Sequence, residues 1–356
     1  MKFNALLRRT PEWMQTSGPH RDIVITSRIR LARNLEGELF PGWAKKEGRF
    51  EVLAKLLPHL NSLPEFQDAF IEDMGDLDQI KKQVLVEKHL ISREQAAKSA
   101  GSAAIINPEQ SISIMVNEED HLRIQSIRSG LDLTQAFAVL DRLDTELSTR
   151  VTYAFDAQLG FLTACPTNLG TGMRASAMLH LPALVLSDSM NQVISAVQKI
   201  GLAVRGLYGE GTEALANLFQ ISNQHTLGEN ELDIIARLEK VIEQIINHER
   251  NARAKLLQDD PNRINDHLGR AYAILRHAHI LESKEAFNHL SMLRMGSDTG
   301  LLPVELGKLL DTVLVEIQPA HLQIASQKKL TAPERDVMRA QMLREKLQQL
   351  PEPRLL

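Results

Sequence analysis

The chain has 356 residues, of which 43% are hydrophobic and 24% charged, an ordinary balance for a folded globular protein. This length favours two domains over one. With 41 Lys+Arg against 45 Asp+Glu, the chain lacks the overall basic charge that would hold nucleic acid or an anionic membrane, so we expect neither as a direct partner.

Residues 1–21 form an N-terminal segment that carries charges and only short apolar pieces, without the apolar core of a secretory signal. No later stretch reaches the roughly 20 apolar residues that a membrane span requires. A single cysteine, Cys165, cannot build an internal disulfide framework, which favours a reducing compartment. We therefore expect a cytoplasmic protein.

Residues 22–252 alternate short runs rich in Val and Ile with helical periodicity, which predicts an α+β domain. The predicted strands include 22–27, 103–107, 111–116 and 202–208, and the predicted helices include 131–147 and 189–199. Residues 253–356 form a second, all-helical domain, because almost everything after residue 229 has helical spacing. Its predicted helices are 231–257, 266–281, 284–294, 303–317 and a last one from the capping box Thr331–Glu334 to about Leu350.

The run Asn117-Glu118-Glu119-Asp120-His121 follows a predicted strand. Adjacent like charges repel, so one carboxyl in the run acquires a raised pKa or needs a cationic partner. By itself the run is more typical of a solvated acidic turn, and the alternative is a catalytic base at a strand end.

Five arginines flank predicted strand ends or loops. Alternation along a strand places Arg28 and Arg30 on one face, and Arg205 inside an apolar strand requires a partner. Each one alone fits a surface salt bridge. Together they predict a polyphosphate site, because a planar guanidinium matches phosphate oxygens; the set is Arg28, Arg30, Arg123, Arg174 and Arg205.

Two glycine-containing loops complete the pattern. Cys165 lies in loop 163–172, where Arg174 and the backbone N–H groups would favour a thiolate, although an inert buried cysteine is the alternative. Glu210 and Glu213 lie on a loop with three glycines, which either closes over a substrate or is a surface hairpin. His89 is either a nucleotide contact or an ordinary surface histidine.

Together these elements resemble the phosphagen (guanidino) kinases, the family of creatine and arginine kinases. The resemblance covers about residues 22–252 and rests, in the family's order, on Ser27–Arg30, Asn117–Arg123, Cys165–Thr171, Arg174–Ser176, Arg205–Glu213 and Ile221–Asn223. It implies an antiparallel sheet flanked by helices, with ATP against the face that carries the arginines.

The resemblance also implies roles for single residues. Glu119 would be the base that orients the acceptor guanidinium, Glu210 the second carboxylate, and Cys165 a thiolate beside the reacting nitrogen. Mg²⁺ would ride on ATP without direct protein ligands. The implied nucleotide contacts are Ser27, Arg28, Ile29, Arg30, His89, Arg123, Arg174, Ala175, Ser176, Ala177, Met178, Arg205, Gly206, Leu207, Tyr208, Gly209 and Glu210.

The chain departs from that family at both ends. Only 26 residues precede Ser27, where phosphagen kinases carry a small helical domain, and a helical region follows the catalytic part instead. This arrangement is similar to the bacterial protein arginine kinases. Arg335, Asp336, Arg339 and Ala340 match their phosphoarginine-sensing motif: Arg335 and Arg339 share a helical face and would hold the phosphate while Asp336 binds the guanidinium. An intrahelical salt bridge is the alternative.

The sequence therefore predicts a protein arginine kinase that marks proteins for regulated degradation in a stress response. The resemblance implies a zinc-binding activator protein and a protease-linked unfoldase as partners, beside the substrates bound through their arginines. Apolar faces of the helical domain, which has no evident catalytic set, favour a homodimer. Two other functions stay open, a kinase of free arginine and a non-catalytic adaptor that binds phosphoarginine.

Overall fold

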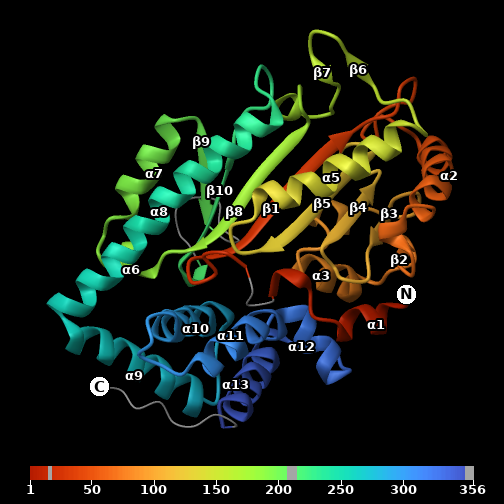
Figure 1. Cartoon of the computed structure of the whole chain (residues 1–356). Coiled ribbons are helices and arrows are strands. Elements are labelled where there is room, and N and C mark those ends of the chain that lie inside the picture. Colours follow the sequence, from red (N-terminus) through yellow and green to blue (C-terminus); the bar gives the residue numbers. More distant parts are fainter. Residues whose placement is uncertain (15–17, 207–214, 349–356) are drawn as a thin grey trace. The chain divides into compact units, whose positions relative to one another are not determined.

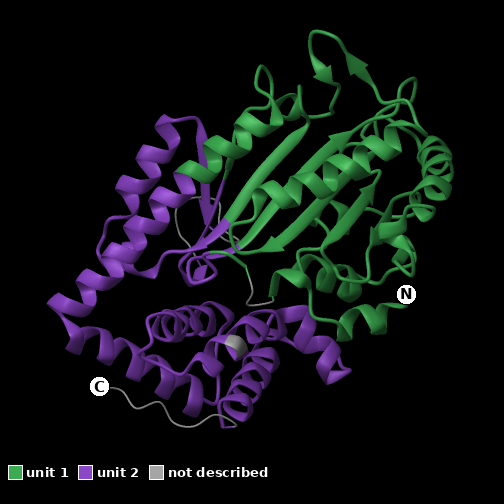
Figure 2. Cartoon of the chain, in the orientation of Figure 1, with its two compact units in different colours: residues 1–19, 26–177, 222–240 green, residues 20–25, 178–221, 241–356 purple. Residues whose placement is uncertain are grey.

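The computed structural model describes residues 1–14, 18–206 and 215–348. The chain divides into two compact units, which Figure 2 colours separately. Unit 1 contains residues 1–19, 26–177 and 222–240, and unit 2 contains residues 20–25, 178–221 and 241–356. Each unit therefore draws on segments that lie far apart in the sequence. The predicted contiguous domains, 22–252 and 253–356, stay a prediction.

The central element is an eight-stranded sheet with the strand order β2-β3-β4-β5-β1-β8-β10-β9 (Figure 1). The pairs β1–β5, β2–β3, β3–β4 and β4–β5 are antiparallel, in agreement with the predicted antiparallel sheet. Four elements contain residues of both units: β1 (Val24–Arg33), β8 (Met173–His180), β10 (Leu218–Asn223) and α8 (Glu231–Asp259).

Unit 1 contributes the strands β2 to β5 of this order, together with several helices, and a separate two-stranded sheet of β6 and β7. Its strands are β2 (Phe70–Asp73), β3 (Ala103–Ile106), β4 (Ile112–Val116), β5 (Leu122–Ser129), β6 (Phe155–Asp156) and β7 (Gly160–Phe161). Its helices are α1 (Phe3–Arg8), α2 (Lys46–Asn61), α3 (Gln79–Glu87), α4 (Arg93–Ala96) and α5 (Leu133–Ser148), with short 3-10 turns η1 (Glu12–Met14), η2 (Pro64–Phe66) and η3 (Pro166–Asn168).

Unit 2 is mainly helical. It contains β9 (Leu202–Gly206), the 3-10 turn η4 (Leu215–Asn217), α6 (Pro182–Leu186), α7 (Met190–Lys199), α9 (Pro261–His277), α10 (Ser283–Asp298), α11 (Val304–Glu316), α12 (Pro319–Ser326) and α13 (Ala332–Gln348). Helix α10 packs between α9 and α11, and α13 packs on α9 and α12. No helix in the described part of the chain is long and apolar enough to span a bilayer.

Apolar periodicity explains how the sheet is covered. On α5 the buried residues Leu133, Ala136, Leu140, Leu143 and Leu147 recur at three- and four-residue spacing and pack on β5. Along β1, Ile29 and Leu31 are fully buried while Arg28 and Arg30, at alternating positions, are half-buried. The strand therefore presents its arginines on the face opposite its apolar residues.

Candidate active site

The acidic run forms the tight turn between β4 and β5, and its first residue fixes the conformation. Asn117 adopts a left-handed backbone conformation with φ 56°, which asparagine tolerates better than most residues. Its side-chain Nδ2 donates to the carbonyl oxygens of Arg49 at 2.8 Å and Gly101 at 2.7 Å. The turn is closed where the Asn117 N–H donates to the His121 carbonyl at 3.0 Å.

Glu118 points away from solvent and pairs with an arginine. Its carboxylate accepts from Nη1 of Arg123 at 2.7 and 2.8 Å and from the Ser92 hydroxyl. Burial acts to raise the pKa of Glu118, but the Arg123 charge and these hydrogen bonds outweigh burial and lower it. Glu118 is therefore the ionised counter-ion that holds the Arg123 guanidinium in place.

Asp120 joins the turn to the loop that carries the cysteine. Its Oδ1 accepts from Nδ2 of Asn34 at 2.7 Å and from the backbone N–H of Ala164 at 2.7 Å. Burial raises the pKa of Asp120, against the opposing effect of these two hydrogen bonds. Because Cys165 directly follows Ala164, the Asp120 carboxyl group helps to position the cysteine.

Glu119 alone of the three acidic residues is exposed. Burial of part of the side chain raises its pKa, followed by repulsion from Asp120 and Glu118, and only Arg123 among the larger influences opposes this. None of these influences is a hydrogen bond from a described residue, so its carboxylate stays available to a ligand. A carboxylate with a raised proton affinity suits a general base.

Four arginines gather on three adjacent strands of the sheet. Arg28 and Arg30 lie on β1, Arg123 on β5 and Arg174 on β8, and β1 lies between the other two strands. Burial, then repulsion from Arg123 and Arg174, lowers the pKa of Arg28 to about 10, and burial and the other three arginines lower that of Arg30. Such mutual repulsion is relieved when a polyanion binds between the guanidinium groups.

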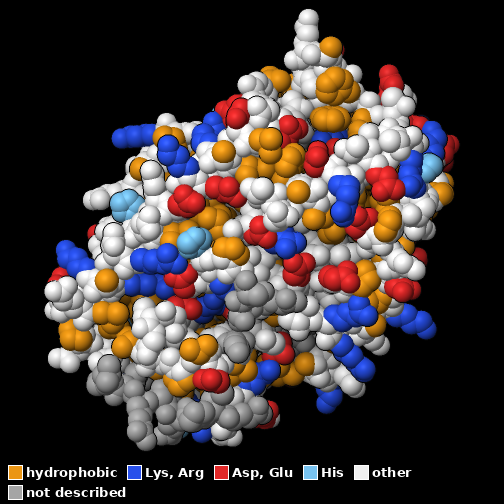
Figure 3. Space-filling view, in the orientation of Figure 1, with side chains coloured by type: hydrophobic (Ala, Val, Ile, Leu, Met, Phe, Trp, Pro, Cys, Tyr) orange, Lys and Arg blue, Asp and Glu red, His pale blue; other side chains and the backbone are white. Residues whose placement is uncertain are grey.

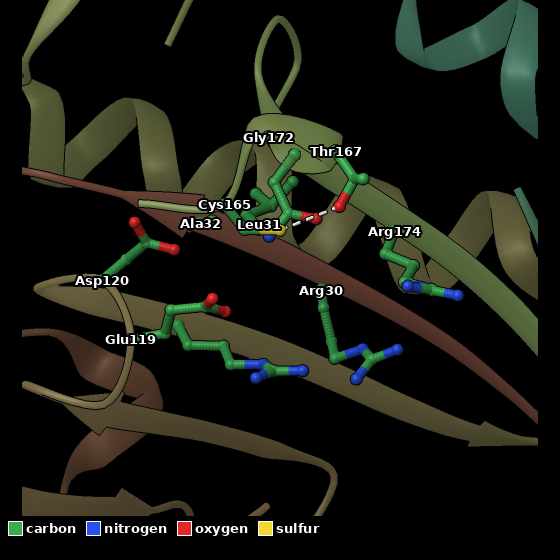
Figure 4. Close-up of a pocket in the computed structure, with 11 residues that line it drawn as sticks. Arg30, Leu31, Ala32, Glu119, Asp120, Cys165, Thr167, Gly172 and Arg174 are labelled. Carbon is green, nitrogen blue, oxygen red and sulfur yellow. Dashed lines mark hydrogen bonds between the residues drawn. The ribbon is translucent and has the colours of Figure 1, made fainter. Parts of the chain in front are cut away.

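The Glu119 carboxylate and three of these arginines, Arg30, Arg123 and Arg174, line the same pocket (Figure 4). Figure 4 shows Glu119 on one side of this pocket, Arg30 and Arg174 on another, and Cys165 beside Thr167. The Sγ atom of Cys165 lies 3.0 Å from Oγ1 of Thr167. The lining residues are Arg30, Leu31, Ala32, Glu119, Asp120, Arg123, Cys165, Thr167, Asn168, Gly172 and Arg174.

His89 lies close enough to the arginine cluster for the charge of Arg28 to affect its pKa. Burial, and then the positive charge of Arg28, lowers the pKa of His89 to about 4, so its imidazole is neutral at physiological pH. Trp13 packs against the ring edge-on, with ring centroids 5.3 Å apart. This location suits the predicted nucleotide contact, which stays a prediction.

The other predicted nucleotide contacts divide by position. Ser27 and Ile29 lie on the face of β1 opposite the arginines, and the Ser27 hydroxyl donates to the Gly130 carbonyl at 2.7 Å. On β8, Ala175 and Ala177 alternate with the site-facing Arg174 and Ser176. Three further predicted contacts belong to unit 2 and are not placed relative to the pocket of unit 1: Met178, Arg205 and Gly206. The remaining predicted residues of the glycine-containing loop lie outside the described residues: Leu207, Tyr208, Gly209, Glu210 and Glu213.

The predicted phosphoarginine sensor lies on α13. Nη1 of Arg339 donates to Asp336 at 2.5 Å and to the Leu281 carbonyl at 2.7 Å, and its Nε donates to the Ile317 carbonyl at 3.1 Å. Arg335 donates to the Leu330 carbonyl at 3.0 Å, and Ala340 is buried. The intrahelical salt bridge named as the alternative is thus present between Asp336 and Arg339, and ligand binding at these residues stays a prediction.

Sequence reasoning missed the residues that support the site. Asn34 is buried, and its Oδ1 accepts from the His121 N–H at 2.9 Å while its Nδ2 reaches Asp120. Nothing in the local sequence distinguishes Asn34 from a loop asparagine, because its partners lie more than eighty positions away. The pairing of Glu118 with Arg123 could have been anticipated from their spacing around a hairpin.

Two family models together match most of the chain. The model described as "ATP:guanido phosphotransferase, C-terminal catalytic domain" matches residues 52–252, and "Protein-arginine kinase McsB C-terminal domain" matches residues 261–355. The chain belongs to the ATP:guanido phosphotransferase family. The predicted class of enzyme, a guanidino kinase, is confirmed by this membership.

Curated relatives resemble the chain over nearly its whole length. "Protein-arginine kinase" of Moorella thermoacetica is 45% identical over 96% of this chain and 98% of its own. "Protein-arginine kinase" of Halalkalibacterium halodurans is 46% identical over 94% of each chain. These relatives place the chain among the protein-arginine kinases of the family, as the sequence predicts.

Solved structures confirm the predicted fold class. The substrate-free duplicated taurocyamine kinase from Schistosoma mansoni has a TM-score of 0.59 and 26% identity, over 76% of this chain and 40% of that one. Lombricine kinase, at 23% identity and a TM-score of 0.59, covers 71% of this chain and 72% of its own, and supports the fold alone.

Proposed function

We propose that the protein transfers the γ-phosphoryl group of ATP to arginine side chains of other proteins. One observation carries the proposal: the exposed carboxylate of Glu119 faces a pocket that is also lined by Arg30, Arg123 and Arg174. A carboxylate to receive a guanidinium and a cluster of guanidinium groups to receive phosphates are the two parts that this reaction requires.

The mechanism follows from the properties of the acceptor. A guanidinium is a poor nucleophile because it is protonated and its lone pairs are delocalised. Glu119 would orient the group and take a proton from one nitrogen as the N–P bond forms and the bond from phosphorus to the ADP oxygen breaks. Arg28, Arg30, Arg123 and Arg174 would hold the phosphates in line, so that catalysis rests on positioning and charge.

The arginine cluster fits ATP as the phosphoryl donor. Arg28, Arg30, Arg123 and Arg174 offer a site for a polyanion on one face of the sheet, and the charges of Arg123 and Arg174 help to lower the pKa values of Arg28 and Arg30. Mg²⁺ would bind to the nucleotide, where it neutralises charge on the phosphates. The roles of Cys165 beside the reacting nitrogen and of Glu210 as a second carboxylate belong to the same proposal.

The product of the reaction tests this function directly. Labelled ATP and a denatured arginine-rich protein should yield label on arginine that acid releases, because a phosphoramidate bond is acid-labile while phosphate esters survive. Mass spectrometry should locate the phosphoryl group on arginine, and Glu119→Ala should abolish it. Acid-stable label, or unchanged labelling by Glu119→Ala, would contradict the proposal.

Two other functions make different predictions in the same assay. A free-arginine kinase would prefer free arginine to a protein substrate. A non-catalytic adaptor would bind a phosphoarginine peptide and transfer no label at all. The exposed Glu119 and the pocket that it shares with three arginines favour an enzyme over the adaptor.

We further propose that phosphoarginine regulates the enzyme through Arg335, Asp336, Arg339 and Ala340. Asp336 is half-buried and bonded to Arg339, so a bound guanidinium would have to replace this intrahelical bond. Asp336→Ala should therefore remove the response of kinase activity to added phosphoarginine while the basal activity persists. An undiminished response in this variant would exclude the site.

Cellular context belongs to the same proposal. Phosphorylation would mark proteins for regulated degradation in a stress response, with a zinc-binding activator and a protease-linked unfoldase as partners in the cytoplasm. A homodimer, formed through the helices after residue 253, is part of this proposal. The native mass of the full chain should be that of a dimer, and the native mass of a chain that lacks the residues after 253 should be that of a monomer.

A further inference from the structure

Two neighbouring segments of unit 1 expose large apolar side chains. Leu39 and Trp43 lie between β1 and α2 with 69% and 85% of their surface exposed, and Phe155 and Leu159 lie in the β6–β7 hairpin with 59% and 42% exposed. Figure 3 shows orange side chains gathered over the hairpin at the top of the molecule. Clustered exposed apolar side chains of this size are typical of a contact surface.

The two segments are joined to each other by backbone hydrogen bonds. The Ala154 N–H donates to the Asn34 carbonyl at 2.8 Å, and the Glu36 N–H donates to the Thr152 carbonyl at 3.0 Å. Leu35 and Tyr153 form an isolated antiparallel bridge between these bonds. The segment with Leu39 and Trp43 and the hairpin with Phe155 and Leu159 are therefore joined at their bases, and we call these four exposed side chains together the rim.

Hydrogen bonds connect the segments of the rim to the turn and the loop that line the pocket. His121, at the end of the acidic turn, hydrogen-bonds the Leu39 carbonyl through Nε2 at 3.0 Å. On the hairpin side, the Phe161 N–H donates to the Gly170 carbonyl at 2.8 Å, within the loop that begins at Cys165. Both edges of the rim are thus bonded to the segments that hold Glu119 and Cys165.

The base of the hairpin is fixed by aromatic packing. The Arg33 guanidinium lies 3.5 Å from the centre of the Phe161 ring, and Phe155 packs edge-on against the same ring at 5.2 Å. Arg33 is held in turn by Asp144 at 2.7 Å. A binding surface that is already ordered in the free protein loses little conformational entropy when its ligand binds.

We propose that the rim binds the polypeptide on either side of the acceptor arginine, and that it selects exposed apolar sequence there. This inference rests on the proposed function and adds the substrate class. Even a long side chain such as that of arginine has a limited reach, so the backbone that carries it has to lie near the pocket's edge. The exposed carboxylates of Glu36 and Asp156 among the apolar groups suit a segment that is basic as well as apolar.

The inference can be tested with two peptides that differ only around one arginine. One peptide has leucine and phenylalanine beside the arginine, the other has serine and glycine, and N-acetylarginine amide serves as the minimal substrate. Trp43→Ala and Phe155→Ala should each raise KM for the apolar peptide about tenfold, since aromatic anchors dominate such contacts. KM for ATP and turnover of the minimal substrate should stay unchanged.

Val304→Ala is the matched control, because Val304 is 64% exposed on a helix of unit 2 and should leave every constant unchanged. Equal KM values for both peptides in the wild type, or equal losses with the minimal substrate, would overturn the inference. Binding of the fluorescently labelled apolar peptide, measured by anisotropy, tests the rim without catalysis. If Trp43→Ala and Phe155→Ala both bind the apolar peptide as tightly as the wild type does, the inference is wrong. If the peptide binds to the rim but is not phosphorylated, only the proposed function is refuted.

Discussion

Replacing Glu119 by glutamine is expected to lower kcat for arginine phosphorylation by roughly 10²–10⁴-fold, the usual contribution of a general base. Glutamine keeps the size of the side chain and its hydrogen-bonding oxygen but cannot accept the proton. Because Glu119 is exposed and accepts no hydrogen bond from the described residues, stability should hardly change. KM for ATP should stay near the wild-type value, because the arginines remain in place.

The pH dependence of the reaction provides the control for this prediction. A base works only when it is ionised, so activity falls as the pH drops through its pKa. Partial burial and the neighbouring Asp120 and Glu118 raise the pKa of Glu119, and the fall should therefore begin at a higher pH than for an ordinary carboxyl group. Residual activity of Glu119→Gln should lack this acidic limb; a variant with wild-type kcat and the same limb would exclude Glu119 as the base.

The largest loss of stability is expected from Glu249→Ala in unit 2. Glu249 is fully buried on α8, and its carboxylate accepts from the N–H groups of Ala183 and Leu184, both at 3.0 Å, and from Nε of Arg253 at 2.8 Å. Its removal takes the nearest acceptor from the buried Arg253 guanidinium, which keeps only the longer contacts to the His180 carbonyl and Asp298, and removes the acceptor of the N–H groups at the start of α6. The free energy of unfolding should fall by about 3–5 kcal/mol, as for other broken buried ion pairs.

An exposed ion pair on the same helix is the matched comparison. Arg250 binds Asp22 at 2.9 Å, but its side chain is exposed, so Arg250→Ala should cost less than about 1 kcal/mol. Urea denaturation measures both variants, and Glu249→Gln should recover part of the loss because its oxygen can still accept from the α6 N–H groups. Similar losses for Glu249→Ala and Arg250→Ala would show that burial does not set the difference.

The sequence was informative where a period or a motif is local. Alternation placed Arg28 and Arg30 on one face, and three- and four-residue spacing located α5, α7 and the helices α8 to α11. The strand β8 was missed because its run Met-Arg-Ala-Ser-Ala-Met lacks the β-branched residues that favour strands. The short helix α12 was also missed, as its eight residues give too few turns for a period to be recognised.

Contacts between distant residues were beyond the reach of local patterns. Helical spacing placed Arg335 and Arg339 on one face, yet it could not say that Arg339 is buried against the carbonyl groups of Leu281 and Ile317. In the acidic run, charge alone could not tell which carboxylate is buried. Which carboxylate is buried depends on hydrogen bonds from Ser92, Asn34 and Ala164, which approach the turn only in the folded chain.

Glu118, Glu119 and Asp120 carry similar carboxyl groups. A shift of the turn by one position would therefore change which of them is exposed to the pocket and which are buried. The left-handed Asn117, bonded to Arg49 and Gly101 through its side chain, fixes the frame in which the middle acid faces outward. Inserting one neutral residue between Asn117 and Glu118 is expected to turn a different acid outward while the net charge of the turn stays the same. The length of this hairpin is therefore as much a determinant of catalysis as the identity of its acids.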